Sequence, residues 1–221
     1  MKKIITSAVL FAAVVAGTPA LAATVIDTTG GAGKFELGSF GGSTTYGQTF
    51  TVGGDTVLNS YSMYLTKMTS ESFQFKSYIY QWNGTGVTGP ALFTSGLQQA
   101  SIGTDRQYAF STTGLQLASN MQYVALMTVD GVPNTNAFGT MMPVVANTTY
   151  SGGNFVYTNS NTFGGGWDCS AQCSFGDAWL KASFSSAVPE TATWGMMIAG
   201  FGVMGAALRT RRRSVRIASA A

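Results

Sequence analysis

The chain has 221 residues, a net charge of +3, two cysteines and no histidine. Without histidine there is no Ser-His-Asp triad, no Cys-His pair and no imidazole ligand for a metal. Charged residues make up 10% of the chain, against about 25% in an ordinary soluble domain, and the length suits one domain with accessory segments.

The first 22 residues are typical of a secretory signal peptide. Two lysines follow the initial methionine, residues 4–16 form an uncharged apolar run, and residues 20–22 (Ala-Leu-Ala) supply the small residues of a cleavage site. As a helix, this run spans only about 20 Å, which is too short for a hydrocarbon core of about 30 Å. We therefore expect signal peptidase to remove residues 1–22, so that the mature chain starts at Ala23.

Residues 23–187 show the alternation with period two that is typical of β-strands with one buried face. Asn-Gly, Asp-Gly and Gly-Gly pairs separate the alternating runs, as turns do. The pattern predicts about eight strands, no amphipathic helix and an all-β fold, a jelly-roll-like β-sandwich. The alternating apolar positions are Tyr61, Met63, Leu65, Met121, Tyr123, Ala125, Met127, Val129, Ala178, Leu180, Ala182 and Phe184.

Residues 72–82 place aromatic side chains on both faces of one predicted strand. Two phenylalanines occupy odd positions, and Tyr78, Tyr80 and Trp82 then occupy even positions. Either the strand is central and covered on both faces, or a bulge switches its phase. Alternatively, these three side chains form an exposed platform that stacks on sugar rings, and Trp167 in a glycine-rich segment is a further candidate ligand contact.

Cys169 and Cys173 form an even pair in a chain expected to be exported. This context predicts a local disulfide that closes the loop of residues 167–175. Because the closed loop is short, its stabilisation should lie at the low end of the usual range. No histidine or third cysteine completes a metal site with this pair.

The acidic residues of the central domain are eight in number and show no spacing that selects a catalytic pair. We therefore assign no catalytic residues, no cofactor and no metal. A glycosidase needs only two suitably placed carboxylates, so a polysaccharide hydrolase remains an alternative. A Ca²⁺ site built from Asp168, Asp177 and loop carbonyls is chemically reasonable, although no recognisable calcium loop is present.

The C-terminal segment 191–208 contains no charged residue. As a helix, these residues span about 27 Å, which is just enough to cross a membrane. Trp194 would lie at the outer interface, and the basic cluster that follows would stay cytoplasmic, leaving the domain outside. A buried hairpin helix with a solvated basic tail is the alternative. The arginines that would stop translocation are Arg209, Arg211, Arg212 and Arg213.

The order of these features resembles the PEP-CTERM sorting tail, in its PEPxxWA subtype. That tail combines a Pro-Glu-Pro motif, a glycine-rich transmembrane helix and an arginine cluster, and it is also catalogued as an "ice-binding protein C-terminal domain". The resemblance covers residues 188–216, and Thr191 stands where the second proline is usual. The motif region comprises Pro189, Glu190, Thr191 and Trp194.

The resemblance implies that this chain is the substrate of an exosortase and not an enzyme. Cleavage would fall near Pro189 and Glu190, after a short stalk at residues 183–188, and the domain could pass to a surface acceptor. A permanent single-pass anchor is the alternative, and residues 217–221 are the cytoplasmic end. We expect a cell-surface or extracellular-matrix protein, non-enzymatic and with affinity for extracellular polysaccharide; a purely structural matrix component is a further alternative.

The net charge of +3 comes from the two ends of the chain. Seven of the twelve basic residues belong to the signal peptide and the arginine tail. The region 23–187 keeps five basic residues against eight acidic ones, a net charge of −3. The basic balance is therefore a targeting feature, and no nucleic-acid partner is expected.

Overall fold

The computed structural model describes residues 24–37, 43–133, 139–145, 150–160, 163, 166–168, 176–187, 195–206 and 209. Within them, the chain forms two antiparallel sheets of seven strands each, which confirms the predicted all-β fold and suits a β-sandwich. The strands are β1 (Thr24–Asp27), β2 (Gly33–Glu36), β3 (Thr45–Thr51), β4 (Val57–Lys67), β5 (Gln74–Trp82), β6 (Val87–Thr94), β7 (Gln98–Gln99), β8 (Gly103–Gln116), β9 (Gln122–Thr128), β10 (Thr140–Val145), β11 (Phe155–Thr158), β12 (Trp167–Asp168), β13 (Asp177–Ala178) and β14 (Leu180–Ser185).

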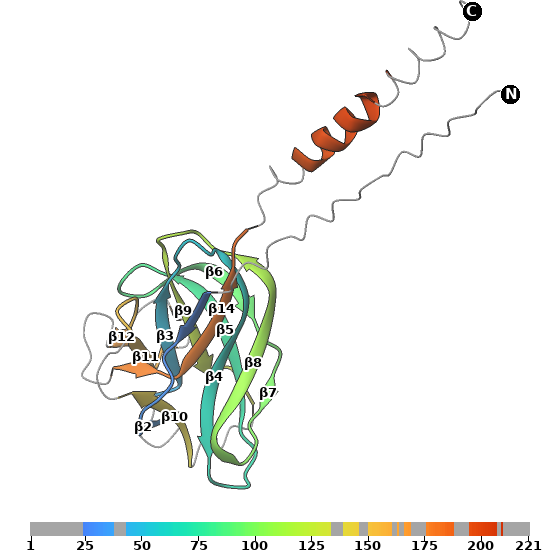
Figure 1. The fold of residues 1–221 in the computed structure, drawn as a ribbon. Helices are drawn as coiled ribbons and strands as arrows, with labels where there is room; N and C mark the ends of the chain where they lie inside the picture. Colours follow the sequence, from blue (N-terminus) through green and yellow to red (C-terminus); the bar gives the residue numbers. More distant parts are fainter. Residues whose placement is uncertain are drawn as a thin grey trace, which may run out of the picture.

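The first sheet has the order β1-β14-β4-β10-β13, with β8 paired to β4 and β2 paired to β10. The second sheet has the order β12-β11-β3-β9-β5-β6, with β7 paired to β5. Strands β1 and β14 run side by side and antiparallel, with Thr24 opposite Phe184. The first strand of the domain therefore starts where the last strand ends, at the same end of the sandwich (Figure 1).

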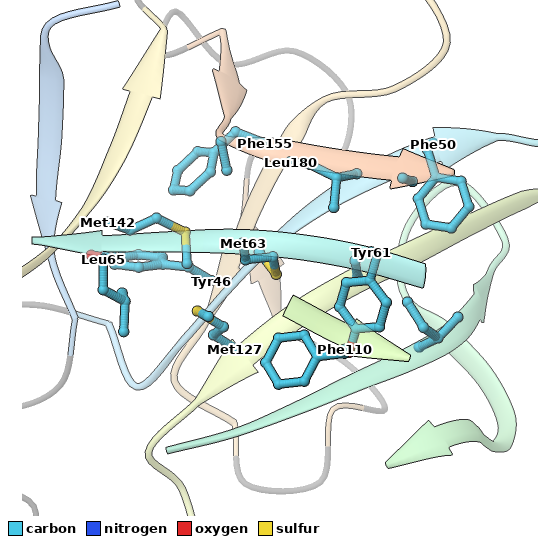
Figure 2. Packing of buried hydrophobic residues seen from close by; sticks show 14 of the residues in the cluster. Tyr46, Phe50, Tyr61, Met63, Leu65, Phe110, Met127, Met142, Phe155 and Leu180 are labelled. Atoms are coloured by element: carbon cyan, nitrogen blue, oxygen red, sulfur yellow. The ribbon is translucent and has the colours of Figure 1, made fainter. Parts of the chain in front are cut away.

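The hydrophobic core lies between the two sheets. Tyr61 and Met63 of β4 and Leu180 of β14 point into it from the first sheet, and Phe50 and Met127 enter from the second (Figure 2). Of the twelve apolar positions predicted from the alternation, all except Met121 belong to this core, and Met121 lies just before β9 with 38% of its surface exposed. The described residues between 24 and 187 thus contain a core of their own, as expected of a domain that folds by itself.

Strand β5 has one face in the main core and a partly covered opposite face. Phe75 and Ile79 point into the core, and the even positions of the strand face the other way. The alternation of β5 therefore keeps one phase in its pairing with β9, and its even face is fully covered at Trp82 and only partly covered at Tyr78 and Tyr80. An irregularity does occur between Ile79 and Gln81, but it lies in the pairing of β5 with β6.

Residues 195–206 form a helix, drawn in orange-red in Figure 1. Among the described residues, no helix is both long and apolar enough to cross a membrane. The predicted span of residues 191–208 includes six that lie outside the described part, as do the predicted signal peptide and residues 217–221. The predicted stalk is shorter at its start, because β14 continues to Ser185.

Candidate functional site

A second apolar cluster lies on the outer face of the second sheet, opposite the main core. Its buried members come from β5, β9, β11 and β12, and Tyr78, Tyr80, Val87 and Phe163 pack against them as partly buried side chains. Gly47 of β3 leaves the space for this packing, since a Cβ atom there would lie 2.8 Å from Val124 Cγ2. The buried members are Trp82, Val124, Leu126, Val156 and Trp167.

The two tryptophans predicted as ligand contacts are interior residues. Trp82 is 3% exposed and Trp167 is 7% exposed, and their rings meet edge to face with centroids 5.2 Å apart. The Trp167 indole N–H donates to the carbonyl of Phe163 at 2.7 Å, so the polar end of this ring is satisfied without solvent. Of the two interpretations, core packing is therefore correct for Trp82 and Trp167, and the alternative of open faces for a sugar is wrong for both.

The other two platform residues keep an accessible position. Tyr78 and Tyr80 are partly buried, with ring centroids 5.9 Å apart and an interplanar angle of 32°. The ring centroid of Phe163 lies 6.0 Å from each of them. Phe163 has a φ of 54°, which a bulky side chain rarely adopts. These three residues form one group, which we name the aromatic triad.

Polar and charged groups border the aromatic triad. Lys76 shares the face of β5 that carries Tyr78 and Tyr80, because side chains two residues apart point the same way. Burial raises the pKa of Tyr78, and the nearby charge of Asp130 raises it further. Burial likewise raises the pKa of Tyr80, so both phenols remain neutral donors at physiological pH. The triad thus combines flat apolar rings with neutral hydroxyls and flanking charges.

Several acidic side chains have structural roles elsewhere in the domain. Asp27 pairs with Lys181 at 3.0 Å, and Asp105 pairs with Lys34 at 2.8 Å. Asp177 is fully buried and accepts hydrogen bonds from the Gln48 amide at 2.9 Å and from the backbone N–H of residue 150 at 3.1 Å. These carboxylates hold segments of the fold together.

The residues of the suggested Ca²⁺ site have different environments. Asp177 is engaged as described above, whereas Asp168 is exposed on β12. Within the described residues, no three His, Cys, Asp or Glu side chains gather into a group that could hold a metal ion.

Other predicted site residues fall largely outside the described part. Of the arginine cluster, Arg209 alone is described, and it is exposed. The disulfide and the processing motif therefore stay predictions. The predicted residues outside the described ranges are Cys169, Cys173, Pro189, Glu190, Thr191, Trp194, Arg211, Arg212 and Arg213.

Two residues of interest have no clear sequence signal. Phe163 joins Tyr78 and Tyr80 from a distant loop, and only its position four residues before Trp167 hints at a role. Asp55 accepts hydrogen bonds from Thr24 and from a serine near the end of β14, 31 and 131 residues away. Comparison with known proteins finds no matching family model and no matching curated protein.

Proposed function

We propose that this chain is an exported surface protein whose C-terminal tail directs its sorting by an exosortase. The observation that carries the proposal is the order of sequence features over residues 188–216: a Pro-Glu motif, an uncharged glycine-rich segment and an arginine cluster. A signal peptide at residues 1–22 would bring the chain to the export machinery. The domain would first be anchored outside the cytoplasmic membrane and then reach the cell surface or the extracellular matrix.

The geometry of the domain supports this proposal. The first and last strands are neighbours, so the segments that precede β1 and follow β14 leave the domain at the same end. A signal peptide and a sorting tail would both face the membrane from there. The opposite end of the sandwich and the outer faces of its two sheets would then lie away from the site of processing.

Mass measurement of the intact mature protein tests the sorting proposal. We expect a chain that starts at Ala23 and ends near Glu190. A double substitution, Pro189→Ala with Glu190→Ala, should leave the tail on the chain, whereas Glu71→Ala in the folded domain should be processed normally. Recovery of surface protein that still carries the arginine cluster would contradict the proposal and favour a permanent anchor.

We propose further that the central domain is a jelly roll. Its main strands are connected as in that fold: β1, β14, β4 and β8 are neighbours in one sheet, and β3, β9, β5 and β6 are neighbours in the other. In chain order, these are the first, eighth, third and sixth strands, and the second, seventh, fourth and fifth. Jelly rolls occur in lectin domains, among others, which by itself assigns no ligand.

The aromatic triad is our candidate for carbohydrate recognition. Tyr78, Tyr80 and Phe163 offer partly exposed rings that can stack on the apolar face of a sugar. The phenol groups, Lys76 and Asp130 lie beside them as hydrogen-bonding partners for sugar hydroxyls. A binding role without catalysis agrees with the use of Asp27, Asp105 and other acids in holding the fold together.

A glycan array with the fragment 23–187 tests the binding proposal. Loss of one stacking ring should weaken binding about 5- to 10-fold, so Tyr80→Ala should lose this factor while Tyr80→Phe keeps most of the affinity. Tyr64→Ala, on the first sheet, is the matched control. Equal loss in Tyr64→Ala and Tyr80→Ala, or no loss in either, would remove the triad as the ligand site. Release of shortened glycans would favour the hydrolase.

A further inference from the structure

The turn that joins β5 to β6 contains the only Asn-Gly pair in the sequence, Asn83-Gly84. A hydrogen bond from the backbone N–H of Asn83 to the carbonyl of Gly86 closes this turn at 3.1 Å. Asn83, Gly84 and Thr85 are exposed, and Gly84 has a φ of 98°, which glycine adopts at little cost. The hairpin therefore holds the Asn-Gly pair at the surface.

The side-chain oxygen of Asn83 accepts three hydrogen bonds. They come from the backbone N–H of Thr85 at 2.9 Å, from the hydroxyl of Thr85 at 3.0 Å and from the backbone N–H of Gly86 at 2.9 Å. A side chain that reaches the N–H two positions further on must fold back over the peptide unit between them, as in an Asx-turn. The carboxamide carbon of Asn83 therefore lies beside the backbone nitrogen of Gly84.

The backbone nitrogen of Gly84 is open to reaction. Within the described part of the chain its N–H donates no hydrogen bond, and a Cβ atom on Gly84 would meet no other atom within 4 Å. The amides that follow two other asparagines are engaged. After Asn154, the N–H of Phe155 donates to a glycine carbonyl at 3.1 Å, and after Asn159, the N–H of Ser160 donates to a threonine hydroxyl at 3.0 Å.

We infer that Asn83 is a site of spontaneous deamidation, with water as the only co-reactant. The nitrogen of Gly84 attacks the carboxamide carbon of Asn83 and gives up its proton, and the carboxamide nitrogen takes up a proton and leaves as ammonia. Water then opens the resulting five-membered succinimide at either of its two carbonyls, which gives aspartate or isoaspartate. The three hydrogen bonds on Asn83 Oδ1 stabilise the negative charge that develops on this oxygen during the attack.

Either product changes the end of the second sheet. Both place a new carboxylate next to Trp82, in a turn that now carries no charged residue. Isoaspartate also lengthens the main chain by one methylene, directly beside the pairing of Trp82 with Val87. Strand β6 lies at the edge of its sheet, and this pair is the one nearest to the turn. We therefore expect the pairing of β5 with β6 to weaken as the protein ages.

Incubation of the purified protein at mildly alkaline pH, followed by digestion at acidic pH and mass spectrometry, tests this inference. The peptide that contains Asn83 should gain the mass of an OH in place of an NH2 and separate into two isomers. In water labelled with heavy oxygen, it should take up one heavy oxygen atom. The peptides that contain Asn59, Asn120 and Asn154 are internal controls and should stay unchanged over the same time. Asn83→Gln would have to close a six-membered ring and should also stay unchanged.

Thr85→Val separates the effect of the turn from that of the Asn-Gly sequence. It removes the hydroxyl donor and keeps the side-chain shape, so the rate should fall by about 2- to 10-fold, the range expected for loss of one hydrogen bond. The matched control Thr88→Val, on β6, should react at the parent rate. Circular dichroism confirms that the variants are folded. Modification of another described asparagine before Asn83, or a rate in Thr85→Val equal to or above that of the parent, would overturn the inference.

Discussion

Replacing Trp82 with alanine separates a structural role from a ligand contact. The side chain is 3% exposed and packs edge to face on Trp167 at 5.2 Å. A buried aromatic side chain of this size removes about 150–250 Å² from water, which at about 25 cal/mol per Å² corresponds to about 4–6 kcal/mol. Allowing for the part that alanine retains, Trp82→Ala should lower the free energy of unfolding by about 3–5 kcal/mol.

Urea unfolding of the fragment 23–187, followed by circular dichroism, measures this loss. Trp82→Phe keeps a ring in the same space and should lose clearly less, about 1–2 kcal/mol. A loss below about 0.5 kcal/mol is typical of a surface substitution. If Trp82→Ala shows so small a loss together with weaker glycan binding, Trp82 is an exposed ligand contact and the packing argument is refuted.

Two further substitutions test specific contacts. In Gly153→Ala, the new Cβ atom would lie 1.8 Å from the carbonyl oxygen of Thr49, so the backbone must shift and the free energy of unfolding should fall by about 1–3 kcal/mol. In the control Gly53→Ala, the new Cβ atom meets no other atom within 4 Å, so the stability should not change. Equal melting temperatures for the two variants would contradict this reasoning. Burial raises the pKa of Asp105, but hydrogen bonds from Lys34 and a threonine outweigh it and hold the pKa below its usual value. Because the pKa of Asp105 is lower in the folded state, its contacts stabilise the fold by about 0.5–1 kcal/mol above about pH 4, and this contribution is lost as the pH falls through the folded pKa. In acid unfolding curves, Asp105→Asn should lack this pH-dependent loss.

Much of the fold was predictable because the local pattern repeats along individual strands. The run at 178–184 alternates, and its apolar members Ala178, Leu180, Ala182 and Phe184 are all at most 2% exposed. The pattern in β9 was less informative, since Val124 and Leu126 on its other face are also fully buried. They are covered by Trp82, Val156 and Trp167, which lie at least thirty positions away in the sequence, and such coverage leaves no periodic signal within β9.

The candidate site was predictable only in part, for the same reason. Tyr78 and Tyr80 could be assigned to one face of a strand from their spacing alone. Trp82, on the same face, is more deeply buried than these two tyrosines because it packs against Trp167. The sequence gives no sign of this contact, because Trp167 lies in a glycine-rich segment that is typical of a loop. The role of Asp55 depends on two hydroxyls that are distant in the sequence, and only the pairing of β1 with β14 brings them together.

The pairing of the first and last strands also determines how the domain resists force. If its two chain ends were pulled apart, β1 would peel from β14 one hydrogen-bonded pair at a time, which needs little force. A load applied between the C-terminal end and the outer face of β5 follows another path, through the first sheet, across the core and into the second sheet. Many contacts then share the load, so a protein held by its tail would withstand a pull on its outer face better than a pull on its own N-terminus.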